Sequence, residues 1–220
     1  MDNSETETLV PPEKSKDLQR PGSPLSSQST DSDSDAPPKK QDLSLLSKLD
    51  LMDKSLSTPI YKLETNCLIE FLIYSFARLF NPDLMACYFI LMFAYHAIVY
   101  KNYSFIIKPL THVLAILIVT LVTKHIIGRP RPQIMEGVKR RFNCRSKETN
   151  CSMPSGDSMQ CASFAIVWVF YFNHFYGLLL IPFVMFSRVF YFCHYLMDTV
   201  VGTIMGLLVS VAMYFILSYF

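Results

Sequence analysis

The sequence predicts an all-α integral membrane protein, a bundle of about six transmembrane helices preceded by a disordered N-terminal tail. Two observations lead to this fold class. Charged residues gather before about residue 64 and within 129–147, and long apolar stretches fill most of the remainder. Several of these stretches approach the ~20 apolar residues that a helix needs to cross the hydrocarbon core of a bilayer. The 220 residues leave room for one such domain and a tail.

The N-terminal part, residues 1–58, is expected to be an acidic, Ser-rich tail that ends in a short amphipathic helix. Most of it contains almost no aliphatic side chains, which is typical of a disordered segment. Its Ser-Thr-Asp-Ser-Asp-Ser-Asp run at 29–35 could be regulated by acid-directed kinases or could simply be solvated. Leu43, Leu46 and Leu49 recur at helical spacing and predict a helix that lies on the membrane, lies on the first span or acts as a linker.

Residues 59–220 are expected to form the transmembrane domain. The predicted spans are about 66–80, 84–100, 109–127, 155–172, 178–192 and 195–217. The third span ends at Gly-Arg-Pro-Arg-Pro, 128–132, where two prolines prevent the helix from continuing. Gly202 and Gly206 in the last span have the GxxxG spacing that permits close helix packing. Packing within the molecule is the interpretation favoured here, and dimerisation is the alternative.

Three ionisable side chains lie inside an apolar and aromatic stretch near the C-terminus: Arg188, His194 and Asp198. Such groups are costly in apolar surroundings unless they are paired or used, so they are candidates for a functional site. His194 and Asp198 are four residues apart and share one face of a helix, where the carboxylate can fix the tautomer of the ring. The other ring nitrogen is then free to act as a nucleophile. A core histidine satisfied by a neighbouring acid is the alternative.

Two further motifs precede this stretch. Lys124 is followed, after six residues, by Arg131 and a proline, and Pro-Ser-Gly at 154–156 opens the fourth apolar span. The third motif is Ser-Arg, five residues, His, three residues and Asp, at 187–198. In this order and spacing the three motifs resemble the signature of the type 2 phosphatidic acid phosphatase (PAP2) superfamily, the membrane lipid phosphatases. The resemblance covers roughly the last 100 to 160 residues and departs from the family at Asp157, where a histidine is usual.

The order of the spans brings the three motifs to one side of the membrane. The first motif lies at the exit of the third span and the second at the entry of the fourth. The third runs from the exit of the fifth span to the entry of the sixth. Because successive spans alternate in direction, all of these positions face the same side, which independently supports one assembled site.

The resemblance implies hydrolysis of a lipid phosphate without a metal or other cofactor. His194 would attack phosphorus to form a phosphohistidine, Asp198 would orient the ring, and water would hydrolyse the intermediate. Cations and helix amides would take the place of a metal in stabilising the transition state. The residues expected to bind the substrate phosphate are Lys124, Arg131, Ser155, Gly156 and Arg188.

Asp157 is expected to take the catalytic place of the family's histidine, which protonates the leaving oxygen. A carboxylic acid can do this if burial or a bound phosphate raises its pKa, whereas nearby cations and the helix N-terminus lower it. A diphosphate expels a phosphate ester, which needs less protonation than an alkoxide. We therefore expect good leaving groups, such as those of isoprenoid diphosphates, to be preferred over phosphatidic acid. A simple first-turn acid on the fourth span is the alternative.

The expected function is thus that of a membrane lipid phosphatase acting on lipid phosphate monoesters or diphosphates, of the phosphatidic acid or isoprenoid diphosphate type. One alternative is a pseudophosphatase that binds lipid phosphate without turnover. It is favoured by Asp157 and opposed by the intact His194–Asp198 pair. The other is a phosphotransferase similar to sphingomyelin synthases, in which a lipid hydroxyl replaces water. The Lys and Arg-Pro motif fits hydrolases better.

The expected partners are the bilayer and a lipid phosphate. No nucleic-acid partner is expected, because the sequence contains no basic repeat of the kind that binds nucleic acid. We expect a multi-pass protein of the endoplasmic reticulum or another endomembrane rather than the plasma membrane. Cys144 and Cys151 could form a disulfide if their loop faces an oxidising lumen. Basic residues lie on both sides of the predicted spans, so the positive-inside rule does not decide the orientation. A lumenal site is the orientation favoured here.

Overall fold

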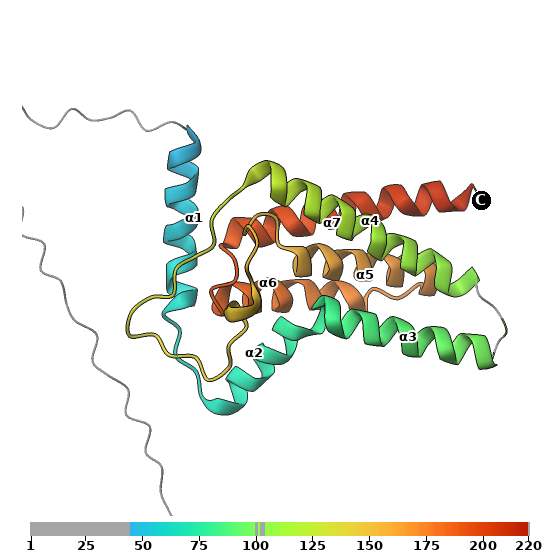
Figure 1. Ribbon diagram of the computed structural model, residues 1–220, viewed down its shortest axis with the longest axis horizontal. Helices are drawn as coiled ribbons and strands as arrows, with labels where there is room; N and C mark the ends of the chain where they lie inside the picture. The colour runs from blue at the N-terminus through green and yellow to red at the C-terminus, as the bar shows by residue number, and fades with distance from the viewer. Residues whose placement is uncertain (1–44, 100, 102–103, 220) are drawn as a thin grey trace, which may run out of the picture. The chain divides into compact units, whose positions relative to one another are not determined.

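The computed structural model describes residues 45–99, 101 and 104–219. These belong to one compact unit, Leu43–Phe220. Within the described ranges the regular structure is entirely helical, which confirms the predicted fold class (Figure 1). The predicted tail before this unit, with its run of serines and aspartates at 29–35, lies outside the described residues, so its proposed phosphorylation stays a prediction.

Seven α-helices and two short 3₁₀ segments make up the described part of the chain. They are α1 (Leu45–Tyr61), α2 (Cys67–Leu79), α3 (Pro82–Val99), α4 (Ser104–Ile127), η1 (Arg145–Lys147), α5 (Gly156–Phe172), η2 (Tyr176–Leu179), α6 (Leu180–Phe190) and α7 (Leu196–Ser218). The six predicted spans correspond to α2 to α7. The third begins earlier than predicted, at Ser104, because the helix includes Pro109 rather than starting at it.

Two of the described helices are long and apolar enough to cross a membrane by length and composition, Ile107–Ile127 within α4 and Leu196–Ser218. The segment η2–α6 forms a shorter apolar stretch, Tyr176–Phe190. Large apolar side chains also cover the outside of the bundle, such as Ile118 on α4 and Leu208 on α7, which are 62% and 66% exposed. A helix that is apolar on all faces is typical of a membrane span.

Helix α7 packs most extensively on α5, and two glycines make this contact possible. A Cβ added at Gly202 would lie 2.6 Å from the carbonyl oxygen of Ser155, and one at Gly206 would lie 2.5 Å from that of Met159. Only glycine allows such an approach of two backbones. The GxxxG spacing is therefore used within the molecule. The amide of Ser155 also donates to the carbonyl of Asp198 at 2.9 Å, which joins the first turns of the two helices.

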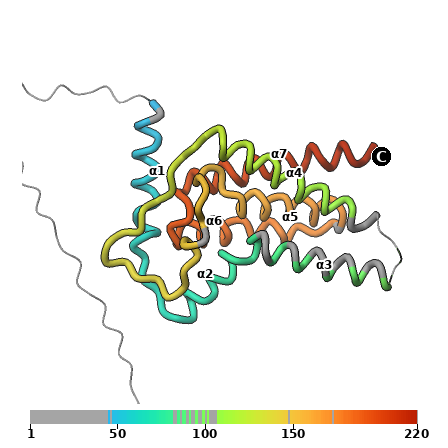
Figure 2. The backbone as a smooth tube through the Cα atoms, viewed as in Figure 1, coloured from blue at the N-terminus to red at the C-terminus, as the bar shows by residue number. Residues whose placement is uncertain are grey.

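Helix α1 lies across one end of the bundle and contacts α6 and α7 (Figures 1 and 2). Its buried residues Asp53, Ser57 and Tyr61 are turned towards the bundle. The exposed side of the helix carries mostly apolar side chains, together with Lys48 and Ser55. The apolar ones are Leu45, Leu49, Leu51, Met52 and Leu56. The predicted amphipathic helix is therefore present, but its polar face is the one that contacts the protein. The compact unit includes α1, and the division expected at residue 58 falls inside this helix.

Candidate active site

Residues of all three motifs lie at the end of the bundle that α1 crosses. The predicted site residues are Lys124 in the last turn of α4, Arg131 in the loop after it, Ser155, Gly156 and Asp157 at the start of α5, Arg188 in the last turn of α6, His194 before α7 and Asp198 in its first turn. Most of them are buried, although they are charged or polar. This end of the bundle is therefore a cluster of buried ionisable groups, which is costly unless the groups are paired or used.

His194 is held between a carboxylate and a cation. It is 1% exposed. Its Nδ1 lies 3.8 Å from Oδ2 of Asp198, and its Nε2 lies 3.4 Å from Nη1 of Arg131. Burial lowers the pKa of His194 to about 3, although Asp198 acts to raise it. The imidazole is therefore neutral at neutral pH, with Nε2 on the side of the arginine and available as a nucleophile.

The backbone before α7 fixes the place of His194. Helix α6 ends at Phe190, and the chain turns at Phe192 with a φ of 57°, a conformation that L-residues rarely adopt. The carbonyl of Arg188 accepts the amides of Cys193 and His194 at 3.1 and 3.3 Å. The hydroxyl of Tyr61 on α1 donates to the carbonyl of His194 at 3.0 Å. The nucleophile candidate is thus tied to both α6 and α1.

Both carboxylate oxygens of Asp198 have partners. Oδ2 accepts the amide of Tyr195 at 2.9 Å and also faces His194. Oδ1 accepts Nη1 of Arg129 at 2.6 Å. Arg129 was missed as a site residue by the sequence analysis, which treated it only as one of the basic residues of the loop. Its place in Gly-Arg-Pro-Arg-Pro, two residues before Arg131, is the signal that could have found it.

The predicted phosphate ligands Arg131 and Arg188 share one anion, the carboxylate of Glu148. Oε2 of Glu148 accepts Nη2 of Arg131 at 2.7 Å, and its Oε1 accepts Nη2 of Arg188. Nη1 of Arg131 also donates to the carbonyl of Cys193 at 2.6 Å. Burial opposes the ionisation of Glu148, but Arg188 and Arg131 outweigh it and lower its pKa to about 2. An oxyanion thus bridges the two guanidinium groups beside His194.

Lys124 shares Asn150 with Arg131, whose Nη2 also donates to Oδ1 of that residue. The Nζ of Lys124 donates to Oδ1 of Asn150 at 3.1 Å and to the carbonyl of Cys151 at 2.8 Å. The three cations are therefore brought to one end of the bundle, but only the two arginines hold the same carboxylate. Lys124 is 7% exposed and bonds only neutral oxygens in these two contacts, so it can still provide charge to an anion that enters.

The start of α5 combines a cap with an ion pair. Ser155 is the N-cap residue, and its side chain accepts the amide of Ser158. Asp157 lies 2.8 Å from Nε of Arg188 through its Oδ2. Asp157 therefore does more than stabilise the first turn of a helix, because it binds the same arginine that Glu148 binds. Gly156 gives the turn close contact with α4, since a Cβ there would lie 3.3 Å from Cγ2 of Thr120.

The disulfide that the sequence allowed between Cys144 and Cys151 is not formed. Cys144 and Cys151 are both free. Cys144 is buried in an apolar cluster with Tyr191 and Phe190, whereas the carbonyl of Cys151 binds Lys124. Burial raises the pKa of the Cys144 thiol to about 12, so it remains a thiol at neutral pH. Among the described residues, no group of three or more His, Cys, Asp or Glu side chains could hold a metal ion.

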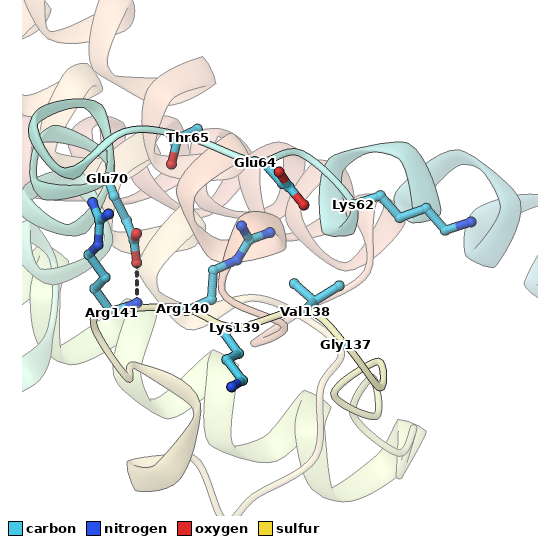
Figure 3. Close-up of a pocket in the computed structure, with 9 residues that line it drawn as sticks. All are labelled: Lys62, Glu64, Thr65, Glu70, Gly137, Val138, Lys139, Arg140 and Arg141. Atoms are coloured by element: carbon cyan, nitrogen blue, oxygen red, sulfur yellow. Dashed lines mark hydrogen bonds between the residues drawn. The ribbon is translucent and has the colours of Figure 1, made fainter.

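A separate cavity of about 380 Å³ opens between the turn after α1 and the loop at 137–141 (Figure 3). The amide of Arg141 donates to Oε1 of Glu70 at 2.6 Å across it. Arg140 donates to the carbonyls of Tyr61 and Leu63, both at 2.7 Å. These bonds fasten the loop that carries Glu148 to the α1–α2 turn, and so to the end of the helix that contacts His194.

The fold and this site define a class of protein: a helical membrane protein with a buried His–Asp pair beside two arginines that bind an oxyanion. The chain belongs to the PAP2 superfamily, whose family model matches residues 105–220. No curated protein matches its sequence.

Two solved structures share the fold. One is described as the first transmembrane PAP2 type phosphatidylglycerolphosphate phosphatase from Bacillus subtilis. It is 18% identical, has a TM-score of 0.62, and the match covers 78% of this chain and 87% of that one. The other is Aquifex aeolicus LpxE, also 18% identical, with a TM-score of 0.58 and coverage of 74% and 94%. At this identity the likeness establishes the fold, an integral membrane bundle of the PAP2 type.

Proposed function

We propose that this protein is a membrane lipid phosphatase that hydrolyses phosphate monoesters or diphosphates of lipids through a phosphohistidine at His194. The observation that carries the proposal is the position of Nε2 of His194, 3.4 Å from an arginine that already holds an oxyanion. Membership of the PAP2 superfamily and the likeness to a phosphatidylglycerolphosphate phosphatase support it.

In this mechanism the substrate phosphoryl group takes the place of the Glu148 carboxylate between Arg131 and Arg188. The two guanidinium groups match phosphate oxygens with charge-assisted hydrogen bonds. Nε2 of His194 forms a bond to phosphorus as the bond to the leaving oxygen breaks. The ring becomes positively charged, and its Nδ1 proton closes the 3.8 Å gap to Asp198 as that charge develops. Water then attacks phosphorus, releases phosphate and restores the neutral imidazole.

Asp157 determines which leaving groups are favoured. Its Oδ2 lies 2.8 Å from Nε of Arg188, so this oxygen is already engaged and is not free to deliver a proton to an alkoxide. A diphosphate expels a phosphate ester that leaves without such help. We therefore propose an isoprenoid diphosphate, rather than phosphatidic acid, as the preferred substrate class. A location in the endoplasmic reticulum or another endomembrane, with the site on the lumenal side, is part of the same proposal.

One observation favours a second candidate, a pseudophosphatase that binds lipid phosphate without turning it over. Arg188 is already engaged by two carboxylates, Glu148 and Asp157. If both stay bound, Arg131 also stays engaged by Glu148, and of the three predicted cations only Lys124 is left for a phosphate. The intact His194–Asp198 pair is the feature that favours the enzyme instead.

The test measures phosphate release by the full-length protein in liposomes, with metal ions chelated and with farnesyl diphosphate and phosphatidic acid offered separately. We expect release that is faster from farnesyl diphosphate and that is lost in His194→Ala. His174→Ala is the matched control, because His174 is exposed at the C-terminal end of α5, away from the site. Equal release by wild type and His194→Ala would contradict the mechanism. Equal rates on the two lipids would contradict the substrate preference.

A further inference from the structure

We propose that α1 is part of the catalytic apparatus, with Asp53 and Ser57 as positioning residues for the pair His194–Asp198. This inference rests on the proposed function and extends it to a helix outside residues 105–220, the part that the superfamily model matches. The juxtaposition that carries it is the buried polar face of α1 against the first turn of α7. Asp53 is 2% exposed and Ser57 is fully buried.

The first contact is with the free amides of α7. The amide of Leu196 donates to Oγ of Ser57 at 2.9 Å, and the amide of Met197 donates to Oδ1 of Asp53 at 2.9 Å. The first amides of a helix have no partner within the helix and are usually capped by the residue just before it. Here the cap comes from a helix more than a hundred positions earlier in the chain. The start of α7 is therefore held against α1 directly.

The second contact runs through Arg129. Its Nη1 donates to Oδ2 of Asp53 at 2.7 Å and to Oδ1 of Asp198 at 2.6 Å. Two buried carboxylates this close would repel each other without a shared cation. Burial works against the charge on Arg129, but Asp198 and Asp53 raise its pKa above its ordinary value. Nη2 of Arg129 also donates to Oδ1 of Asp50 at 2.6 Å. Asp53 and Asp50 of α1 thus together hold the guanidinium that binds one oxygen of Asp198, and Asp53 is the one that shares Nη1 with Asp198.

These contacts determine which oxygen of Asp198 serves the histidine. Arg129 occupies Oδ1, so Oδ2 is the oxygen that faces Nδ1 of His194. The hydroxyl of Ser57 also donates to the backbone carbonyl of Asp53 at 2.8 Å, which orients the oxygen that accepts the amide of Leu196. A catalytic pair must be held to within about half an ångström by its surroundings. None of the bonds described for Asp53 and Ser57 reaches the arginines that hold Glu148, so we expect these residues to affect kcat more than KM.

The experiment measures kcat and KM on farnesyl diphosphate in liposomes for Asp53→Asn, Ser57→Ala and the matched control Ser55→Ala. Ser55 lies on the exposed side of the same helix. We expect kcat to fall about 10- to 100-fold in Asp53→Asn and about 3- to 10-fold in Ser57→Ala, with KM changed less than about threefold. Ser55→Ala is expected to match wild type. Ser57→Thr keeps the hydroxyl and is expected to recover most of the activity lost in Ser57→Ala.

A double-mutant cycle separates positioning from general stability. If Asp53 acts through Asp198, then Asp53→Asn costs less than about twofold in kcat when Asp198→Asn is already present. Full additivity, or a loss confined to KM, would overturn the inference. Melting temperatures of the same samples identify any variant that fails to fold. If Asp53→Asn fails to fold, the comparison of Ser57→Ala with Ser57→Thr decides. Equal kcat values for these two variants would also overturn the inference.

A binding measurement distinguishes this inference from the proposed function. Orthovanadate is tetrahedral like phosphate, and it can add a histidine nitrogen to form a five-coordinate adduct that resembles the transition state of phosphoryl transfer. Its binding therefore needs the histidine and the cations but no turnover. We expect orthovanadate to raise the melting temperature of wild type, and to raise that of Asp53→Asn by less than half as much. If wild type binds orthovanadate but releases no phosphate, the proposed function alone is contradicted. If orthovanadate raises the melting temperatures of wild type and Asp53→Asn equally, the role of α1 is overturned. If wild type neither binds orthovanadate nor releases phosphate, the proposed function and the role of α1 are both overturned.

Discussion

At the residue scale, Glu148 explains how two buried arginines remain stable while no substrate is bound. Each oxygen of its carboxylate binds one guanidinium, and those charges lower its pKa to about 2. The side chain is therefore ionised at neutral pH. In the proposed mechanism it competes with the substrate phosphate for Arg131 and Arg188.

Glu148→Gln is accordingly expected to bind substrate more tightly. The amide keeps the size of the side chain but binds a guanidinium less strongly than a carboxylate does, since charge-assisted bonds are about twice as strong as neutral ones. We expect KM for farnesyl diphosphate to fall about 3- to 10-fold, with kcat changed less than about threefold. Glu64→Gln, on the exposed turn after α1, is the matched control. A large loss of kcat with unchanged KM would instead make Glu148 a participant in the chemistry.

His194 predicts how stability depends on pH. Burial lowers its pKa in the folded protein to about 3, below its ordinary value of 6.5. The unfolded chain then binds a proton that the folded protein excludes, so the stability from this group is complete above about pH 6.5 and is lost as the pH falls towards 3. We expect the melting temperature in detergent to fall less between pH 7 and pH 5 in His194→Gln than in wild type. An identical fall in both proteins would contradict the buried neutral imidazole.

At the element scale, the contact between α5 and α7 sets the distance between the two halves of the site. Gly202 lies against the backbone of Ser155, and the amide of Ser155 is bonded to the carbonyl of Asp198. The N-cap of α5 and the carboxylate beside His194 are therefore held in one register. The close approach of the helices is a condition for the site as well as for the fold.

Gly202→Ala is expected to disturb both the packing of α5 on α7 and the geometry of the site. Its Cβ would lie 2.6 Å from a backbone oxygen, which cannot move aside as a flexible side chain would. Overpacking of this kind costs about 1–3 kcal/mol of stability. We expect a lower melting temperature together with reduced phosphate release. Leu208→Ala, on the exposed side of the same helix, is expected to leave both close to wild type. Full activity in Gly202→Ala would show that phosphate release does not depend on the close approach of α5 and α7.

At the scale of the whole molecule, the fold and the motif residues could be predicted because their signals are local. Apolar length marks the spans, and the spacing of Lys124, Arg131, His194 and Asp198 marks the site. The order of the spans was enough to bring the motifs to one end of the bundle. The close packing of α5 on α7 was visible in the spacing of two glycines.

The contacts that complete the site could not be predicted, because they join segments far apart in the chain. Arg129 binds an acid 76 positions before it and another 69 positions after it, and neither bond leaves a periodic signal. Glu148 lies in an irregular loop that no motif covers. The hydrophobic pattern of α1 identified the helix, but it did not show that the polar face is buried. The Cys144–Cys151 bridge, which the sequence allowed if the loop faces an oxidising lumen, is not formed in the structure: Cys144 is buried in an apolar cluster, and the carbonyl of Cys151 binds Lys124.

The account depends most directly on a covalent bond between phosphorus and His194. We would mix wild-type protein with farnesyl diphosphate labelled at its terminal phosphate, quench within milliseconds, and map the label by peptide mass spectrometry. We predict an acid-labile, base-stable phosphoryl group on His194 that is absent in His194→Ala and retained in His174→Ala. Phosphate release without label on His194, or label on another residue, would contradict the account.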